Sequence, residues 1–225
     1  MSDELPSLGP SERFTFPSPR RVRNPGPVCA GGNLSPGFLL SAYEQGLFPW
    51  YSPEERGPIL WWSPDPRFVL VPEELHVGKR LRRYLNTAHF EITWDQRFEE
   101  VMTLCGTSRE FTWIDEPMLE GYKKLHELGY AHSCEVSLDG ILVGGLYGVR
   151  TGRIFSGESM FSRATNSSKA ALIDLCSQAR NLGLDLIDCQ METPYLRSMG
   201  AKPIPRREFL AILNHGLEIP SNTWF

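Results

Sequence analysis

Two polar side chains interrupt a short apolar segment, LIDCQ (186–190), whose composition predicts a β-strand. Asp188 and Gln190 are two positions apart, so in a strand both side chains point to the same face. A carboxylate and a carboxamide on one side of an apolar strand must find hydrogen-bond partners or face a cleft. The pair is therefore a candidate for chemistry that uses a negative charge beside an orienting amide. The alternative is a structural hydrogen-bonded pair.

Further candidate residues lie outside this strand. Glu158 lies in GESMFS (157–162), between two apolar stretches at the end of a predicted strand. Trp50 and Trp113 are flanked by proline or turn sequences (FPW and TWI), which suits them to stacking on a nucleic-acid base better than the strand residue Trp94. The alternative for each tryptophan is an ordinary place in the core.

The charge distribution is uneven. The net charge of −4 argues weakly against nucleic-acid binding, because phosphate groups attract basic surfaces. Lys79, Arg82 and Arg83 nevertheless lie within five positions, together with Arg80. They indicate a locally basic face on an acidic protein, or simply a solvated helix face.

Several classes of protein are disfavoured by what the sequence lacks. No GxSxG, GxxxxGK[ST], HExxH or GxGxxG motif is present, and the five cysteines form no CxxC pair. We therefore expect no metal and no cofactor. The acidic N-terminus has no secretory character, and no stretch is apolar enough to cross a bilayer, so we expect a reduced cytoplasmic protein without a membrane association.

The predicted elements indicate an α+β fold. Residues 47–68 contain five prolines and are expected to form a long ordered loop, with a domain boundary near residues 65–70. Beyond it, three strands, a helix, a strand and a closing helix follow one another, and segment 141–149 is expected to be a central strand. The order fits an acetyltransferase-like core. An enzyme that uses acyl-CoA, however, needs a glycine-rich loop before the central helix, and SRATNSSKAA contains no glycine.

Nine collinear segments together resemble the leucyl/phenylalanyl-tRNA–protein transferases. Among them are GGNLSPGFLLSAYEQGLFPWYSP, ILWWSPDPRFVL, LVGGLYG, GESMFS, LIDCQ and GAKPIPRREFL, and the nine extend from about residue 31 to residue 213. Three positions depart from the family's pattern. Family members tend to have Trp at the position of Ser137 and His at the positions of Tyr130 and Tyr195.

The resemblance implies a small N-terminal domain (1–66) and a C-terminal, acetyltransferase-like (GNAT-like) mixed-sheet domain (67–225). It implies an enzyme that moves Leu or Phe, and Met less well, from aminoacyl-tRNA to proteins whose N-terminal residue is Arg or Lys. In bacteria this transfer marks the acceptor protein for degradation through the N-degron pathway.

The resemblance also assigns roles to residues. Asp188 and Gln190 become the catalytic pair, with Gln190 nearest the attacking amine, and Glu158 joins them. Trp50 and Trp113 surround the 3′-terminal adenosine, while Leu146 and Phe155, on the strands flanking Glu158, are candidates to line the pocket for the transferred side chain. The basic residues that would grip the acceptor-stem backbone are Lys79, Arg82 and Arg83.

The donor ester is already activated, so the enzyme must position it, supply a neutral amine and stabilise the oxyanion. Because an amide is a very poor base, we hypothesise that Asp188 supplies the negative charge and that Gln190 relays or orients through hydrogen bonds. Glu158 has two candidate partners, the donor's ammonium and the acceptor's basic side chain. The rival functions are an acyl-CoA N-acyltransferase and a non-catalytic tRNA- or degron-binding module.

Overall fold

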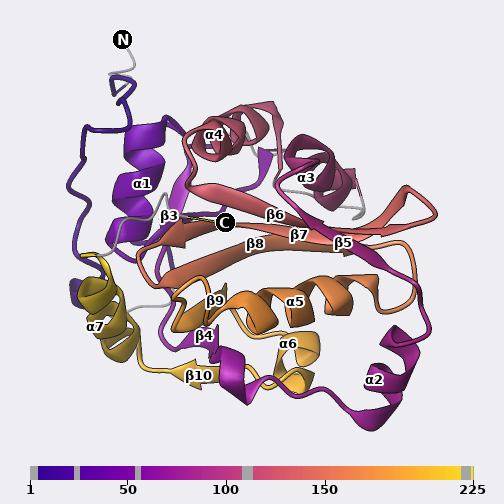
Figure 1. Ribbon diagram of the computed structural model, residues 1–225. Coiled ribbons are helices and arrows are strands. Elements are labelled where there is room, and N and C mark those ends of the chain that lie inside the picture. The colour runs from indigo at the N-terminus through magenta and orange to yellow at the C-terminus, as the bar shows by residue number, and fades with distance from the viewer. Residues whose placement is uncertain (1–4, 23–25, 54–56, 108–113, 219–223, 225) are drawn as a thin grey trace.

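A seven-stranded mixed sheet forms the centre of the computed structural model, which describes residues 5–22, 26–53, 57–107, 114–218 and 224 (Figure 1). The strand order is β10-β4-β9-β8-β7-β6-β5. Neighbouring strands are antiparallel except β8 and β9, which are parallel. The strands are β4 (Arg67–Leu70), β5 (Glu91–Trp94), β6 (Ala131–Leu138), β7 (Ile141–Thr151), β8 (Ile154–Ser162), β9 (Leu186–Gln190) and β10 (Lys202–Ile204).

Helices cover both faces of this sheet, which confirms the expected α+β class. The parallel pair β8–β9 needs a crossover connection, and α5 (Ser167–Gln178) supplies it along one face. On the opposite face lie α1 (Pro36–Glu44), α3 (Phe98–Thr107) and α4 (Glu116–Glu127) (Figure 1). The other helices of the described residues are α2 (Lys79–Leu85), α6 (Pro194–Ser198) and α7 (Arg206–Gly216), with 3-10 turns η1 (Pro19–Arg21) and η3 (Pro72–Glu74).

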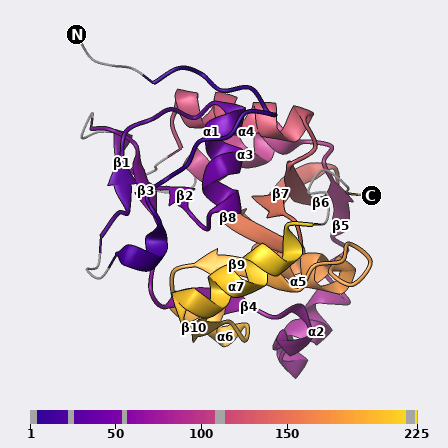
Figure 2. The same cartoon turned by 90° about the vertical axis from the view of Figure 1, so that its left-hand side faces the viewer.

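A small second sheet lies in the N-terminal part, beside α1 (Figure 2). Its order is β1 (Cys29–Ala30), β3 (Leu60–Trp62) and β2 (Phe48–Pro49). The prediction of a loop over 47–68 was wrong for β2 and β3, and for the start of β4. Proline is tolerated at a sheet edge, and Pro49 lies in the edge strand β2, whereas the central strand β3 contains no proline.

Strand β7 is central and largely buried, as predicted for segment 141–149. Two of its glycines allow close packing. A Cβ atom on Gly144 would lie 2.4 Å from the Cβ of Ser167, so the first residue of α5 packs directly on the strand. A Cβ atom on Gly148 would lie 2.6 Å from Cε1 of Phe155. The glycines thus set the position of α5 and of the Phe155 ring.

The N-terminal segment shares one hydrophobic core with the rest of the chain. Phe38 and Leu39 of α1 belong to the same buried cluster as Tyr122 of α4 and Tyr147 of β7. A domain boundary at residue 66 remains a prediction, but the shared core means that α1 can contribute side chains to a site on the large sheet. Within the described ranges, no helix is both long enough and apolar enough to cross a membrane.

Candidate functional site

A cavity of about 450 Å³ opens beside the carboxyl end of β9, where β2, β8, α5 and α6 meet. Its wall is mainly apolar, and a few polar side chains converge at one place in it. Such a concave site with few polar groups is typical of small-molecule sites. Six residues proposed from the sequence line it: Trp50, Leu146, Phe155, Glu158, Asp188 and Gln190. Trp113 lies outside the residues that the structure describes.

Asp188 is fully buried and ion-paired with Arg67. The Arg67 Nε atom donates to Asp188 Oδ1 at 2.8 Å and Nη2 donates to Oδ2 at 2.6 Å. Asp188 Oδ2 also accepts from the Ser156 hydroxyl at 3.3 Å, and Oδ1 accepts from the backbone N–H of Gln190 at 2.9 Å. Both carboxylate oxygens therefore have fixed donors, and Asp188 contacts Gln190 through the backbone of that residue.

Arg67 was not among the site residues predicted from the sequence. It connects the N-terminal segment with the large sheet. Its guanidinium lies 4.8 Å from the ring centre of Phe48 and 4.4 Å from that of Phe209. Its Nη1 atom donates to the carbonyl of Gly46 at 3.2 Å. Only 1% of the residue is exposed. The signal available was a lone arginine directly before the apolar run FVL, at the position where a strand begins.

Gln190 ends β9 in a backbone conformation that L-residues rarely adopt, with φ at +58°. Its side-chain Nε2 atom donates to Glu158 Oε1 at 2.8 Å. Residues held in the left-handed region commonly lie at functional sites, because the surrounding structure must maintain them. Here Asp188 accepts a hydrogen bond from the backbone N–H of Gln190 and so holds this left-handed conformation. The conformation in turn places the side-chain carboxamide of Gln190 beside Glu158.

Glu158 is also reached by two buried tyrosines. The Tyr122 hydroxyl donates to Glu158 Oε2 at 3.3 Å, and the hydroxyl of Tyr43 is hydrogen-bonded to that of Tyr122. Burial, reinforced by the Glu158 charge, raises the pKa of both tyrosines, so both stay protonated. These tyrosines lie buried on α1 and α4, and no local pattern in the sequence links them with Glu158.

Burial raises the pKa of Glu158 to about 7, and the neighbouring Asp188 charge acts in the same direction. Hydrogen bonds from Tyr43 and Tyr122 and the charge of Arg67 oppose this shift. A carboxylate with a pKa near neutrality can accept and return a proton at working pH. The site thus combines a proton acceptor, a fixed carboxamide and an apolar cavity. In the described residues no group of His, Cys, Asp and Glu side chains could hold a metal ion.

Trp50 lines the cavity on the side of the small sheet. The ring is half-buried and lies 5.3 Å from that of Trp62, whose Nε1 donates to the Trp50 carbonyl at 2.7 Å. Part of the indole is therefore open to stacking. Tyr195, one of the three positions expected from the resemblance to depart from the family's pattern, also lines the cavity. Burial raises the pKa of its hydroxyl to about 12.

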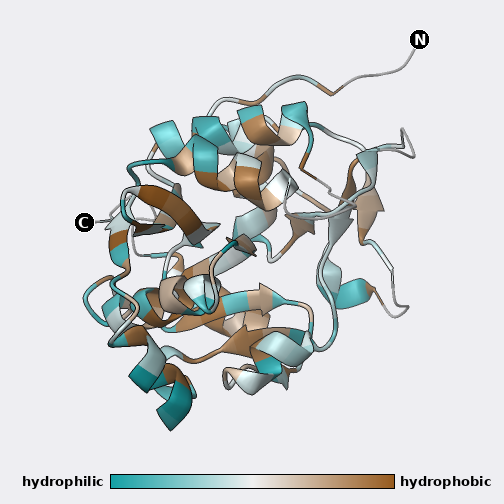
Figure 3. Cartoon of the chain, turned by 90° about the vertical axis from the view of Figure 1, so that its right-hand side faces the viewer, coloured by the Kyte–Doolittle hydropathy of each residue, from teal (hydrophilic) through white to brown (hydrophobic). Residues whose placement is uncertain are grey.

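The basic residues Lys79, Arg82 and Arg83 do not line the cavity. They lie on α2 and are exposed, and the helix contributes no buried residue to the core. Figure 3 shows α2 as a hydrophilic helix at the periphery. No ion pair to these three side chains occurs within the part of the chain that is described. Their charges remain available to a partner.

Comparison with known proteins gives one consistent result. Residues 32–65 match the family model of the leucyl/phenylalanyl-tRNA protein transferase N-terminal domain, and residues 69–214 match that of leucyl/phenylalanyl-tRNA protein transferase. The chain is 50% identical over 212 residues to the leucyl/phenylalanyl-tRNA–protein transferase of Syntrophus aciditrophicus, covering 92% of this chain and 88% of the relative. It is 53% identical over 198 residues to that of Thiobacillus denitrificans, covering 87% and 86%.

Solved structures resemble the chain more distantly. A GCN5-related N-acetyltransferase from Kribbella flavida shares 15% identity with a TM-score of 0.39, covering 75% of this chain and 61% of that one. An aminoglycoside acetyltransferase in complex with sisomicin shares 14% identity with a TM-score of 0.40, covering 48% and 82%. Similarity at this level carries no information on the reaction.

Proposed function

Because the chain belongs to the leucyl/phenylalanyl-tRNA–protein transferase family and is an aminoacyltransferase, we propose that it moves Leu or Phe, and Met less well, to N-terminal Arg or Lys of acceptor proteins. The transferred residue would mark the acceptor for the N-degron pathway, in the cytoplasm where charged tRNA is made. The observation that carries this proposal is the apolar cavity with Glu158 and Gln190 at its polar end.

The chemistry requires one proton acceptor. The acceptor's α-amine attacks the carbonyl carbon of the aminoacyl ester, the new C–N bond forms and the C–O bond to the tRNA ribose breaks. The amine loses a proton and the departing ribose oxygen gains one. Glu158, with its pKa near 7, takes the proton from the amine and passes it to the ribose oxygen.

Gln190 holds the attacking amine in this scheme. Its amide nitrogen is engaged by Glu158, which leaves the amide oxygen to accept a hydrogen bond from the amine. Asp188 acts through Gln190, since it fixes the backbone of that residue and supplies a negative charge nearby. Of the two partners considered for Glu158, this arrangement favours neither the donor ammonium nor the acceptor side chain, because the carboxylate serves the reacting amine itself.

The donor occupies the cavity. The apolar wall, which includes Leu146 and Phe155, would receive the Leu or Phe side chain, and Trp50 would stack on the terminal adenine. Stacking of one base contributes roughly 1–3 kcal/mol. An apolar pocket gains only about 1–3 kcal/mol for each methylene of the bound side chain, so it discriminates weakly between donors by size alone. This agrees with a site that accepts both Leu and Phe.

The proposal is tested by incubating the purified chain with radiolabelled Phe-tRNA and a peptide that begins with Arg. We expect label in the peptide, and none in a matched peptide that begins with Glu. Acyl-CoA in place of tRNA should give no product. Transfer from acyl-CoA would support the rival N-acyltransferase, and binding of Phe-tRNA without any transfer would support a binding module.

We also propose that α2 binds the acceptor-stem backbone of the tRNA through Lys79, Arg82 and Arg83. Reversing all three to Glu should raise the Michaelis constant for tRNA and flatten its salt dependence, because each lost phosphate contact removes roughly 0.9 from the logarithmic salt slope on a duplex. Transfer rates at 50 to 300 mM salt measure this effect, and kcat should change little.

The control is a triple reversal with the same change of net charge on other surfaces, namely Arg97, Lys123 and Arg180 to Glu. Arg97 and Lys123 are half-exposed and pair with the exposed residues Glu100 and Glu99, contacts that contribute little to stability, and Arg180 is exposed. An unchanged salt dependence after charge reversal on α2 would reject the proposal that α2 binds the tRNA. An equal change in the control variant would reject it too.

A further inference from the structure

Trp224, one residue before the end of the chain, packs on the α5 face of the large sheet. Its ring stacks on that of His132, with 4.0 Å between centroids and 8° between planes. The ring of Trp94 lies 5.5 Å away and the guanidinium of Arg150 lies 5.8 Å from the Trp224 ring centre. The indole is therefore held by an aromatic and a cationic side chain as well as by the imidazole.

The residues that receive this indole are themselves fixed. His132 Nδ1 lies 2.7 Å from Asp95 Oδ2, and Nε2 lies 3.1 Å from the carbonyl of Gly129. Trp94 donates its Nε1 hydrogen to Asp174 Oδ2 of α5 at 2.8 Å. The surface that receives the Trp224 ring thus belongs to the large sheet and α5.

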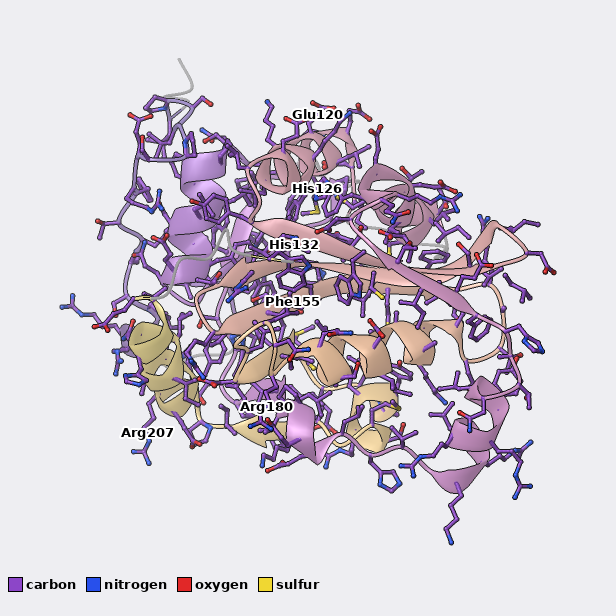
Figure 4. The ribbon with its side chains drawn as sticks, in the orientation of Figure 1. Glu120, His126, His132, Phe155, Arg180 and Arg207 are labelled. Atoms are coloured by element: carbon purple, nitrogen blue, oxygen red, sulfur yellow. The ribbon has the colours of Figure 1, made fainter. Side chains whose placement is uncertain are left out.

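Phe155 connects Trp224 with the cavity. The two rings lie 5.7 Å apart, tilted by 33°. Phe155 is fully buried, lines the cavity and passes over Gly148, where a Cβ atom would collide with it. Figure 4 shows Phe155 between the sheet and α5. The Phe155 ring is therefore confined by Gly148 on one side and by Trp224 on another.

We propose that Trp224 sets the size limit of the donor side chain by holding Phe155 in the wall of the cavity. The inference rests on the proposed function, in which this cavity receives the side chain of Leu or Phe. Removing the indole gives the Phe155 ring room to turn away, and the cavity lengthens toward the vacated place. The change then favours a donor larger than Phe, such as Trp, over Leu.

The experiment uses one tRNA charged in turn with Leu, Phe and Trp, an Arg-starting peptide, and the full-length variants Trp224→Ala and Trp224→Phe. In Trp224→Ala we expect kcat/KM for the Trp donor relative to the Leu donor to rise at least about tenfold, a size of effect typical of one or two methylenes. In Trp224→Phe, which retains a ring on His132, the ratio should stay within about threefold of wild type.

Phe14→Ala is the matched control, because Phe14 is a partly buried aromatic residue that packs on Phe38 away from the cavity. It should lower the melting temperature without changing the donor ratio. A parallel loss of rate for all donors in Trp224→Ala would overturn the inference, because a merely structural role predicts that result. Unchanged rates for all donors would overturn it as well. If wild type transfers Leu and Phe but the ratio does not move, only the role of Trp224 is rejected. If wild type transfers no donor, the proposed function fails too.

Discussion

Glu158→Gln should lower kcat about 10²- to 10⁴-fold while the affinity for aminoacyl-tRNA stays nearly constant. The loss follows because the variant keeps the shape and the contact with Gln190 but removes the only proton acceptor that the proposed scheme uses, and general base catalysis typically contributes this much. Single-turnover transfer from Phe-tRNA and a separate binding titration measure the two quantities. A variant that transfers at the wild-type rate would exclude Glu158 as the base.

The pH dependence gives a sharper form of the same prediction. In wild type, kcat/KM should rise with pH in two steps, one near 7 from Glu158 and one near 8 from the acceptor's amine. Glu158 must be ionised and the amine must be neutral, so both steps have the same sign. In Glu158→Gln the step near pH 7 should disappear and the step near 8 should remain. Persistence of both steps would assign the lower one to another group.

The same variant should be more stable than wild type above pH 7. Since burial raises the pKa of Glu158 from 4.5 to about 7, the unfolded chain releases this proton first as the pH rises. Neutral Glu158 therefore contributes its full share to the free energy of unfolding below pH 4.5. This contribution is lost as the pH rises to about 7. The loss is at most on the order of 3 kcal/mol, because one pKa unit corresponds to about 1.36 kcal/mol and the side chain keeps some solvent contact.

Urea unfolding at pH 4.5 and pH 8 measures this effect, with Glu73→Gln as the control because Glu73 is an exposed carboxylate outside the cavity. The difference in unfolding free energy between Glu158→Gln and wild type should grow with pH, and that of Glu73→Gln should stay flat. A gain in stability that accompanies a loss of activity is the pattern expected where a carboxylate is buried for function.

The parts of the site that could be predicted from the sequence are those that depend on local spacing. The apolar segment LIDCQ predicts one strand that carries both Asp188 and Gln190, and the interval of two residues relates their side chains. In the structure both residues lie on β9 and line the cavity. Glu158 was identified as a charge between two apolar stretches, but its expected position at the end of a strand was wrong, because β8 continues past it to Ser162. Their catalytic roles remain predictions.

Contacts between residues far apart in the sequence could not be predicted from local spacing. Arg67 pairs with a residue 121 positions away, and Tyr43 and Tyr122 are separated by 79 positions, so no local pattern could indicate either pair. The strands in the proline-rich segment were missed for a related reason. Pro49 is acceptable only because β2 lies at the edge of a sheet, and a position in a sheet is a property of the tertiary fold.

The buried pair of Arg67 and Asp188 should be required for both stability and rate, and the two effects can be separated. Removing one partner leaves a buried charge without compensation, so Arg67→Met should lower the free energy of unfolding by about 3–5 kcal/mol. Asp188→Asn should slow transfer strongly and leave tRNA binding nearly intact. An equal loss of binding would contradict a role of Asp188 in the chemical step.

The two single variants should shift the pH profile in opposite directions, because Arg67 lowers the pKa of Glu158 and Asp188 raises it. The step assigned to Glu158 should move to higher pH in Arg67→Met and to lower pH in Asp188→Asn. The double variant Arg67→Met, Asp188→Leu replaces the ion pair by apolar side chains and should recover most of the lost stability. It should not recover transfer, because the backbone of Gln190 loses the carboxylate that holds its left-handed conformation. Recovery of activity in a stable double variant would show that the pair serves only the fold.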